Sequence, residues 1–278
     1  MRSLMWVHLL ILFAPALAVA GNASPSPLYA RQSDSFRVIS NSAEHASSYV
    51  LERCEQLKET LQRVWLGDSS PASWRPRCQI VVHTERAGYL RAVGPQGQQT
   101  LGSSWIEFDS GRPAVRRIDL LADNQGNLSA LAHELTHVVL ADRFQGRQPP
   151  RWLDEGVATM ADSSDKRLLH RRDCRYALET GSALRLVEVL HLESFHSAEE
   201  VPPFYGQSLA LVDFLASKGA PGTIVDFAES AMNHGYDHAL RLHYDIPSVA
   251  ALEQLWRKHA HSGAPATLFA SLNTKISP

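Results

Sequence analysis

Apolar and polar positions follow two different periods in the first part of the chain. An alternation of period two, which is typical of half-buried strands, predicts four short strands. They cover residues 36–40, 79–83, 104–109 and 115–121, the last two joined as a hairpin across Ser110-Gly111-Arg112-Pro113. A helical spacing of apolar positions instead predicts a long helix over residues 43–66 and a short helix over residues 87–93.

Apolar positions in the remainder of the chain follow the helical spacing almost throughout. The predicted helices cover residues 127–144, 151–180, 205–218, 221–233, 235–243 and 248–261. Strands that precede helices, rather than alternate with them, favour the α+β class. We therefore expect a small mixed sheet with helices over residues 34–126, followed by a helical part over residues 127–278.

The N-terminus has the composition of a signal peptide over residues 1–20. Arg2 provides a positive charge, residues 9–17 are apolar, and Ala18-Val19-Ala20 fits a cleavage site after Ala20. The apolar run is too short for a good membrane span, and an uncleaved anchor is the alternative. Residues 21–33 are rich in Ser, Pro and Ala and are predicted to be a linker. We therefore expect a secreted or periplasmic protein with no stable membrane insertion after cleavage.

The charge of the chain constrains its partners. A net charge of −2 over 278 residues gives no global attraction to nucleic acid, so no nucleic-acid partner is expected. A local basic run consists of Lys166, Arg167, His170, Arg171, Arg172 and Arg175. We favour a solvated helix face, and the alternative is a patch that attracts an acidic substrate or a cell-envelope polymer.

Export permits disulfides; either Cys54 pairs with Cys78, or all 3 Cys are buried thiols.

Residues 133–137 read His-Glu-Leu-Thr-His, and this motif narrows the function most. On a helix, positions i and i+4 lie on one face, roughly 5–6 Å apart at Cβ. His133 and His137 can therefore each give a ring nitrogen to one metal ion. Glu134 lies about 100° around the helix from His133, where its carboxylate can deprotonate a metal-activated water. Because such a motif also arises by chance, a solvated amphipathic helix is the alternative.

A catalytic zinc site usually has three protein ligands and one open position, so a third ligand is needed. Residues 152–156 read Trp-Leu-Asp-Glu-Gly, beyond a helix stop that Gly146 and two prolines indicate. Glu155 follows His137 by 18 positions, and an antiparallel second helix can return it to the metal. Asp154 is the competing candidate, with a shorter carboxylate that points about 100° away.

Together the two segments resemble the signature of the gluzincins, which are zinc peptidases with two His ligands and one Glu ligand. The most similar group is the compact bacterial peptidase-MA-like proteins, and the resemblance covers about residues 127–215. It implies a thermolysin-like catalytic architecture, with one Zn²⁺ ion held by His133, His137 and Glu155. It also implies that an extended peptide pairs with an edge strand, here residues 102–108 or their partner 115–121. No Gly-Ala-Met-Glu-Asn type segment precedes His133, so the specificity of the larger aminopeptidases is not supported.

Two further residues are candidates for the site. The resemblance gives Tyr205, in Pro-Phe-Tyr-Gly-Gln-Ser, the role of donor to the oxyanion of a tetrahedral intermediate. The alternative for Tyr205 is aromatic packing. Thr159 lies one turn after Glu155, where an outer-shell hydrogen bond to a zinc-bound His is possible. We favour a plain helix-surface role for Thr159.

These observations predict an exported zinc metallopeptidase that acts on a peptide or protein substrate. A metal-activated water attacks the peptide bond, with Glu134 as general base. One alternative is a non-catalytic zinc-holding binding module of the cell envelope, and another is a zinc amidase that acts on a non-peptide or cell-wall amide. An intact Glu134 argues against the binding module, because metal retention alone does not need it. The sequence does not indicate an oligomeric state.

Overall fold

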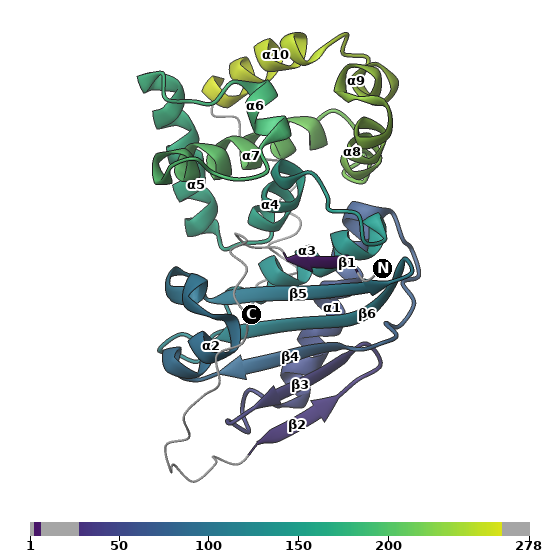
Figure 1. The fold of residues 1–278 in the computed structure, drawn as a ribbon, viewed down its shortest axis with the longest axis vertical. Coiled ribbons are helices and arrows are strands. Elements are labelled where there is room, and N and C mark those ends of the chain that lie inside the picture. Colours follow the sequence, from purple (N-terminus) through teal and green to yellow (C-terminus); the bar gives the residue numbers. More distant parts are fainter. Residues whose placement is uncertain (1–2, 7–27, 263–278) are drawn as a thin grey trace. The chain divides into compact units, whose positions relative to one another are not determined.

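The computed structural model describes residues 3–6 and 28–262 and has the α+β class that we predicted (Figure 1). Contacts divide the chain into two compact units. The first consists of Met1–Gln56 and Ala72–Glu134, and the second of Leu57–Pro71 and Leu135–Pro278. The division after Glu134 falls inside one continuous helix, α3 (Leu131–Phe144).

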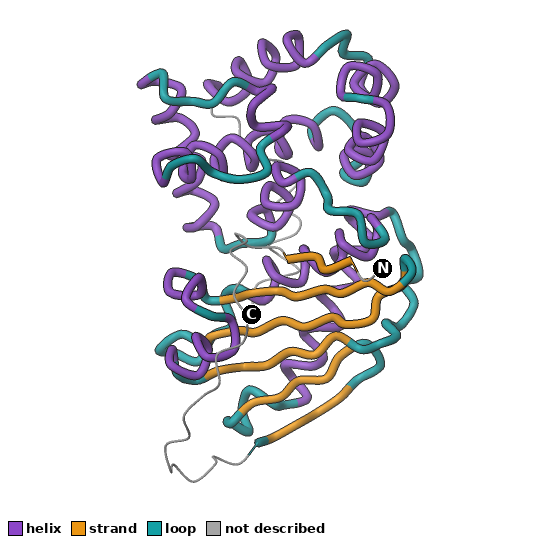
Figure 2. Tube along the Cα trace, viewed as in Figure 1, coloured by secondary structure: helices purple, strands orange, loops and turns teal. Residues whose placement is uncertain are grey.

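The first unit contains one mixed sheet (Figure 2). Its strands are β1 (Ser3–Trp6), β2 (Tyr29–Gln32), β3 (Phe36–Ser40), β4 (Cys78–His83), β5 (Gly102–Asp109) and β6 (Arg112–Leu121). They lie in the order β1-β5-β6-β4-β3-β2. Strand β4 is parallel to β3 and β6, whereas β5 is antiparallel to β6 and β2 to β3. The prediction of a mixed sheet built from four of these strands is confirmed.

Strand β2 lies where we predicted a linker. All of its side chains are exposed, so the segment has no apolar alternation for a sequence pattern to reveal. Antiparallel backbone pairing with β3 holds it, with Tyr29 opposite Ser40 and Gln32 opposite Arg37. The predicted signal peptide and its cleavage point at Ala20 lie outside the described residues, apart from Ser3–Trp6, whose backbone pairs with β5.

One face of the sheet forms an apolar core. Its buried side chains include Phe36, Val38, Ile80, Val82, Ile106, Ile118 and Leu120. Helix α1 (Ser48–Leu66) is tied to the start of β3 by Glu55. Glu55 Oε1 accepts hydrogen bonds from Ser33 Oγ at 2.8 Å and from Ser35 N at 2.7 Å. The helix begins later than the predicted residue 43, and the Ser47 hydroxyl caps it by accepting from the Val50 amide at 3.4 Å.

A short helical segment fixes the entry into β5. Helix α2 (Arg86–Val93) is followed by the 3₁₀ helix η1 (Pro95–Gln99). The Arg86 guanidinium donates to the carbonyl of Gly97 at 3.1 Å, and the Tyr89 hydroxyl bonds Thr100 Oγ1 at 2.7 Å. These contacts anchor the loop that leads into Gly102, the first residue of β5.

The described part of the second unit is helical throughout (Figure 2). Besides the end of α3 it contains α4 (Arg151–Met160), α5 (Ser164–Thr180), α6 (Leu186–His191), η2 (Ala198–Glu200), α7 (Val201–Ala216), α8 (Thr223–His234), α9 (Tyr236–Tyr244) and α10 (Val249–Ser262). The predicted helix over residues 151–180 is two helices, because the chain turns after Met160 and Ser163 caps α5. Helix α6 was not predicted.

Helix α7 contacts α4, α5, α8 and α10 and is the centre of this unit. Two glycines permit its closest approaches. A Cβ on Gly156 of α4 would lie 2.6 Å from Val212 Cγ2, and a Cβ on Gly206 of α7 would lie 2.5 Å from the carbonyl oxygen of His170. Real Cβ atoms do not approach other heavy atoms so closely, so both positions require glycine for this packing. The glycines thereby bring α4 and α5 against α7.

The cysteines of the chain are buried thiols. No disulfide joins Cys54 and Cys78, so the structure has the second of the two alternatives that the sequence left open. Burial raises the pKa of the Cys174 thiol to about 12, which keeps it protonated and unreactive near neutral pH. Among the helices that the structure describes, none has both the length and the apolar character needed to cross a membrane.

Candidate metal centre

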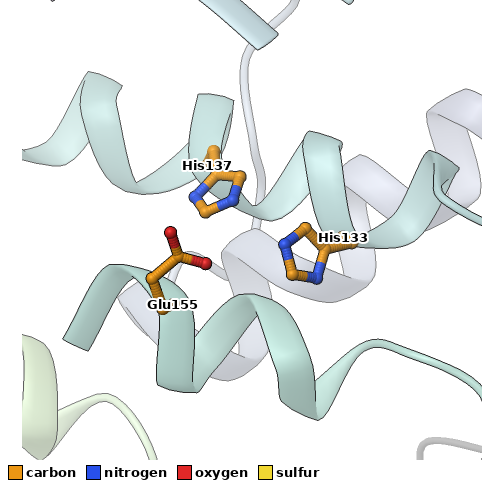
Figure 3. A group of neighbouring side chains, drawn as sticks. All are labelled: His133, His137 and Glu155. Atoms are coloured by element: carbon orange, nitrogen blue, oxygen red, sulfur yellow. The ribbon is translucent and has the colours of Figure 1, made fainter. Parts of the chain in front are cut away.

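Helix α3 carries the first three residues of the candidate site. His133, Glu134 and His137 are all buried, with exposures of 6%, 3% and 0%. The helix begins at Leu131, and the Glu134 amide donates to the carbonyl of Ala130 at 3.0 Å. His133 and His137 are one helical turn apart, so both imidazoles lie on the same side of α3 (Figure 3). The helical spacing read from the sequence is confirmed.

Glu155 of α4 completes a group of three donors. One ligand atom from each of His133, His137 and Glu155 lies within 4.8 Å of the other two, so the group could hold a metal ion. The Glu155 carboxylate points toward the two imidazoles (Figure 3) and its side chain is buried. The prediction that residues from two successive helices meet at one point is therefore confirmed.

Asp154 has a different role from Glu155, although the sequence left both as candidate ligands before the resemblance was considered. The Asp154 carboxylate accepts a hydrogen bond from His137 Nδ1 at 2.8 Å, and both side chains are buried. A carboxylate at Nδ1 requires the proton on that nitrogen, which leaves Nε2 as the nitrogen that could bind an ion. Such outer-shell carboxylates fix the orientation of a ligating imidazole and raise its basicity.

Glu134 lies beside the donor group and is not one of its members. Its Oε2 atom is buried and has no hydrogen-bond partner among residues 28–262. Burial of a carboxylate oxygen without a hydrogen-bond partner costs free energy. Such an oxygen is suited to accept a hydrogen bond from a water molecule or a proton from a substrate. The arrangement of a partnerless carboxylate beside three converging donors fits a bound divalent ion with an open position.

Strand β5 borders Glu134 in the first unit. A Cβ placed on Gly102 would lie 2.5 Å from Glu134 Cγ, 2.8 Å from Glu134 Oε1 and 2.8 Å from Ala130 Cβ. The sequence left open whether β5 or its hairpin partner β6 lies near the motif. The contact at Gly102 favours β5, which without β1 is also the terminal strand of the sheet.

Tyr205 reaches Glu155 from the beginning of α7. Burial, and after it the nearby charge of Glu155, raise the pKa of the Tyr205 phenol well above its usual value, and the charge of Arg151 opposes this shift. The phenol therefore stays protonated near neutral pH. The structure thus brings Tyr205 to a metal donor, while its predicted role toward an oxyanion stays a prediction.

Thr159 makes no hydrogen bond to a histidine. It is fully buried, and its Oγ1 has no hydrogen-bond partner among the described residues. The proposed outer-shell contact is therefore absent, and so is the surface position that we favoured. Asp154, and not Thr159, makes the hydrogen bond to a histidine of the donor group.

Sequence reasoning missed Arg151 and Gly102. Arg151 precedes Glu155 by one helical turn, so helical spacing was the available signal. An isolated glycine in a strand pattern often marks a close approach, and Gly102 begins the alternating segment.

The basic run does not form a continuous basic surface. Lys166 pairs with Asp162 at 2.9 Å, Arg171 with Asp213 at 3.5 Å, and the buried Arg167 donates to the carbonyl of Met160 at 3.3 Å. Arg172 and Arg175 are exposed. His170 also lies 3.7 Å from the Asp173 carboxylate, so four of the six residues are engaged within the second unit.

Comparison of the chain with protein-family models and with curated proteins finds no match. The resemblance to gluzincins therefore depends on the motif residues and on the donor group.

Proposed function

We propose that the chain is an exported zinc-dependent peptidase of the gluzincin type, with a thermolysin-like catalytic architecture. The observation that carries the proposal is the convergence of His133, His137 and Glu155 within 4.8 Å, with Glu134 buried beside them. Two imidazoles and one carboxylate are a common ligand set of catalytic zinc, which keeps a fourth position open. A zinc ion held there would supply Lewis acidity and lower the pKa of a water molecule from about 15.7 toward 7.

The residues of the chain then have distinct tasks. His133, His137 and Glu155 hold the ion, and Asp154 orients His137 through its 2.8 Å hydrogen bond. Glu134 accepts a proton from the attacking water and delivers it to the leaving amine. Tyr205 lies near Glu155, and its hydroxyl is the donor that we propose for the developing oxyanion.

Strand β5 is the proposed docking edge for substrate, once cleavage of the predicted signal peptide removes Ser3–Trp6, which pair with β5 here. Gly102 contacts Glu134, so a peptide that adds to the edge of β5 runs past the general base. Strand addition provides hydrogen-bond partners for the N–H and C=O groups of the peptide backbone. Alternate side chains of the peptide then determine which substrates are preferred. The buried position of Glu134 also favours a hydrolase over a zinc-holding module, because metal retention does not require this carboxylate.

The test compares wild type with Glu134→Gln on a peptide library, with peptidoglycan fragments assayed in parallel. Glu179→Gln, at an exposed position of α5, is the matched control. We expect all three proteins to bind one zinc ion, and Glu134→Gln to lose about 10²–10⁴-fold in activity, as is typical for removal of a general base. If wild type and Glu134→Gln are equally inert on every peptide, the peptidase proposal fails. Cleavage of the peptidoglycan fragments alone would instead favour the amidase alternative.

Export is tested separately. Mature protein recovered from the periplasm or medium of an expressing bacterium should begin at Gly21. An intact N-terminus on cytoplasmic protein would contradict this part of the proposal.

A further inference from the structure

Arg151 is the first residue of α4 and lies one helical turn before Glu155. Arg143, Arg147, Arg171 and Arg257 each form an ion pair with Asp or Glu. Arg151 forms none with the carboxylates of residues 28–262; its Nη1 instead donates to the backbone carbonyl of Glu193 at 3.2 Å. No direct ion pair therefore neutralises its charge within the part of the chain that the structure describes.

Neighbouring aromatic rings hold the guanidinium in place. Its Cζ lies 4.2 Å from the ring centroid of Phe195 and 5.6 Å from that of Phe204. Aromatic faces attract a guanidinium and limit its conformations. Arg151 is therefore a cation that is held in one place and keeps donors for a further ligand.

This cation lies close to the candidate metal centre. Arg151 and Glu155 are one turn apart on α4, roughly 5–6 Å apart at Cβ, and the Tyr205 phenol lies near both side chains. One residue of extended chain spans roughly 3.3–3.6 Å. A peptide whose cleaved carbonyl lies at the donor group can therefore reach Arg151 with a group one or two residues away.

We propose that Arg151 determines specificity by binding a substrate carboxylate within two residues of the cleaved bond. The inference rests on the proposed peptidase function and adds its substrate class. A guanidinium binds a carboxylate through two parallel N–H···O bonds, and the partly buried position of Arg151 strengthens them. The carboxylate is either the free C-terminus of the peptide or an Asp or Glu side chain.

The experiment uses matched peptides and the full-length mature protein loaded with zinc. One pair differs only in a free or amidated C-terminus, and another pair carries Glu or Gln beside the cleaved bond. Because hydrogen bonds to a charged group are strong, we expect wild type to prefer, in one of the two pairs, the peptide that carries the carboxylate. The preference should be roughly 10- to 100-fold in kcat/KM. The pair that shows the preference identifies the source of the carboxylate.

Variants of Arg151 test whether this residue is the cause. Arg151→Met should bring the preference close to one, and Arg151→Lys, which keeps the charge and loses the planar fork, should retain part of it. Arg147→Met, at an exposed position in the turn that follows α3, should keep the wild-type preference. If Arg151→Met does not fold, as judged by circular dichroism, Arg151→Lys alone decides, and an unchanged preference in it overturns the proposal.

The two proposals fail in different ways. Glu134-dependent cleavage without any preference for a carboxylate, or with a preference that survives in Arg151→Met, overturns the role of Arg151 and leaves the peptidase proposal intact. Absence of cleavage of every peptide by wild type overturns both.

Discussion

Replacing Gly102 with Ala is expected to disable Glu134 without removing the metal. The added Cβ would lie 2.5 Å from Glu134 Cγ and 2.8 Å from Glu134 Oε1. Carbon atoms normally remain about 3.5–4.0 Å apart, so the Glu134 side chain must move by about 1 Å. Gly102 lies within a strand and is not among the residues with positive φ, so Ala strains no backbone angle there. The clash with Glu134 and Ala130 is the main perturbation.

The magnitude follows from the displacement. A misplacement of about 1 Å at a catalytic group costs on the order of 10²-fold in rate, which is about 2.7 kcal/mol in the activation free energy. Overpacking at this buried position should also lower the free energy of unfolding by about 1–3 kcal/mol. The nearest atoms to the new Cβ belong to Glu134 and Ala130, so the metal donors keep their positions and the zinc content stays at that of wild type.

The assay is kcat at a temperature well below the melting temperature of Gly102→Ala, together with zinc content. Gly219→Ala is the matched control, because its added Cβ would approach no atom closer than Thr223 Oγ1 at 3.7 Å. In a Glu134→Gln background, Gly102→Ala should cost little further activity, since both changes act through one side chain. Wild-type kcat in Gly102→Ala would refute the reasoning, and so would an equal loss in Gly219→Ala.

Two further changes test the surroundings of the site and of the sheet. Asp154→Asn should weaken zinc affinity by about 10–100-fold, as measured by competition with a chelator, while Asp165→Asn on exposed α5 should not; equal affinities would contradict the outer-shell role. Asp119→Asn should lower the free energy of unfolding by about 2 kcal/mol at pH 7. Burial raises the pKa of the Asp119 carboxyl, but hydrogen bonds from Arg117 and His83 outweigh it and hold the pKa below its usual value. The Asp119 contribution is therefore present above pH about 4 and is lost as the pH falls through the lowered pKa, so the melting curves of wild type and Asp119→Asn should converge in acid; a difference that persists below pH 2 would contradict this.

Features that depend on local geometry could be predicted from the sequence. Strand β3 matches its predicted bounds because its buried positions alternate regularly. The spacing of His133 and His137 fixed their common side, since a helix repeats every 3.6 residues or so. Glu155 could be predicted because the chain between His137 and Glu155 contains the end of one helix and the start of another. That spacing allows an antiparallel second helix to bring Glu155 back to the histidines.

Features that depend on tertiary packing could not be predicted from the sequence. Strand β2 has no buried side chain, so only its pairing with β3 defines it. Gly156 and Gly206 gave no local signal, although each permits an approach of another element within 3 Å of an added Cβ. Asp154 and Glu155 are adjacent carboxylates in the sequence, and the residues alone could not divide their roles, because the division depends on how α4 faces α3.

The charges around the site explain why these neighbours occur together. Glu134, Asp154 and Glu155 are carboxylates with exposures of 3%, 2% and 2%, and buried negative charges require compensation. A divalent ion at the donor group would offset two of them. Arg151 makes no direct ion pair, but it lies one turn before Glu155 on α4, so its charge offsets the third at longer range. The resting site is then close to neutral, so negative charge that develops on a substrate oxygen meets no net repulsion. Loss of Arg151 would leave one negative charge in excess, and it should therefore weaken anionic substrates more than neutral ones, in accord with its proposed role.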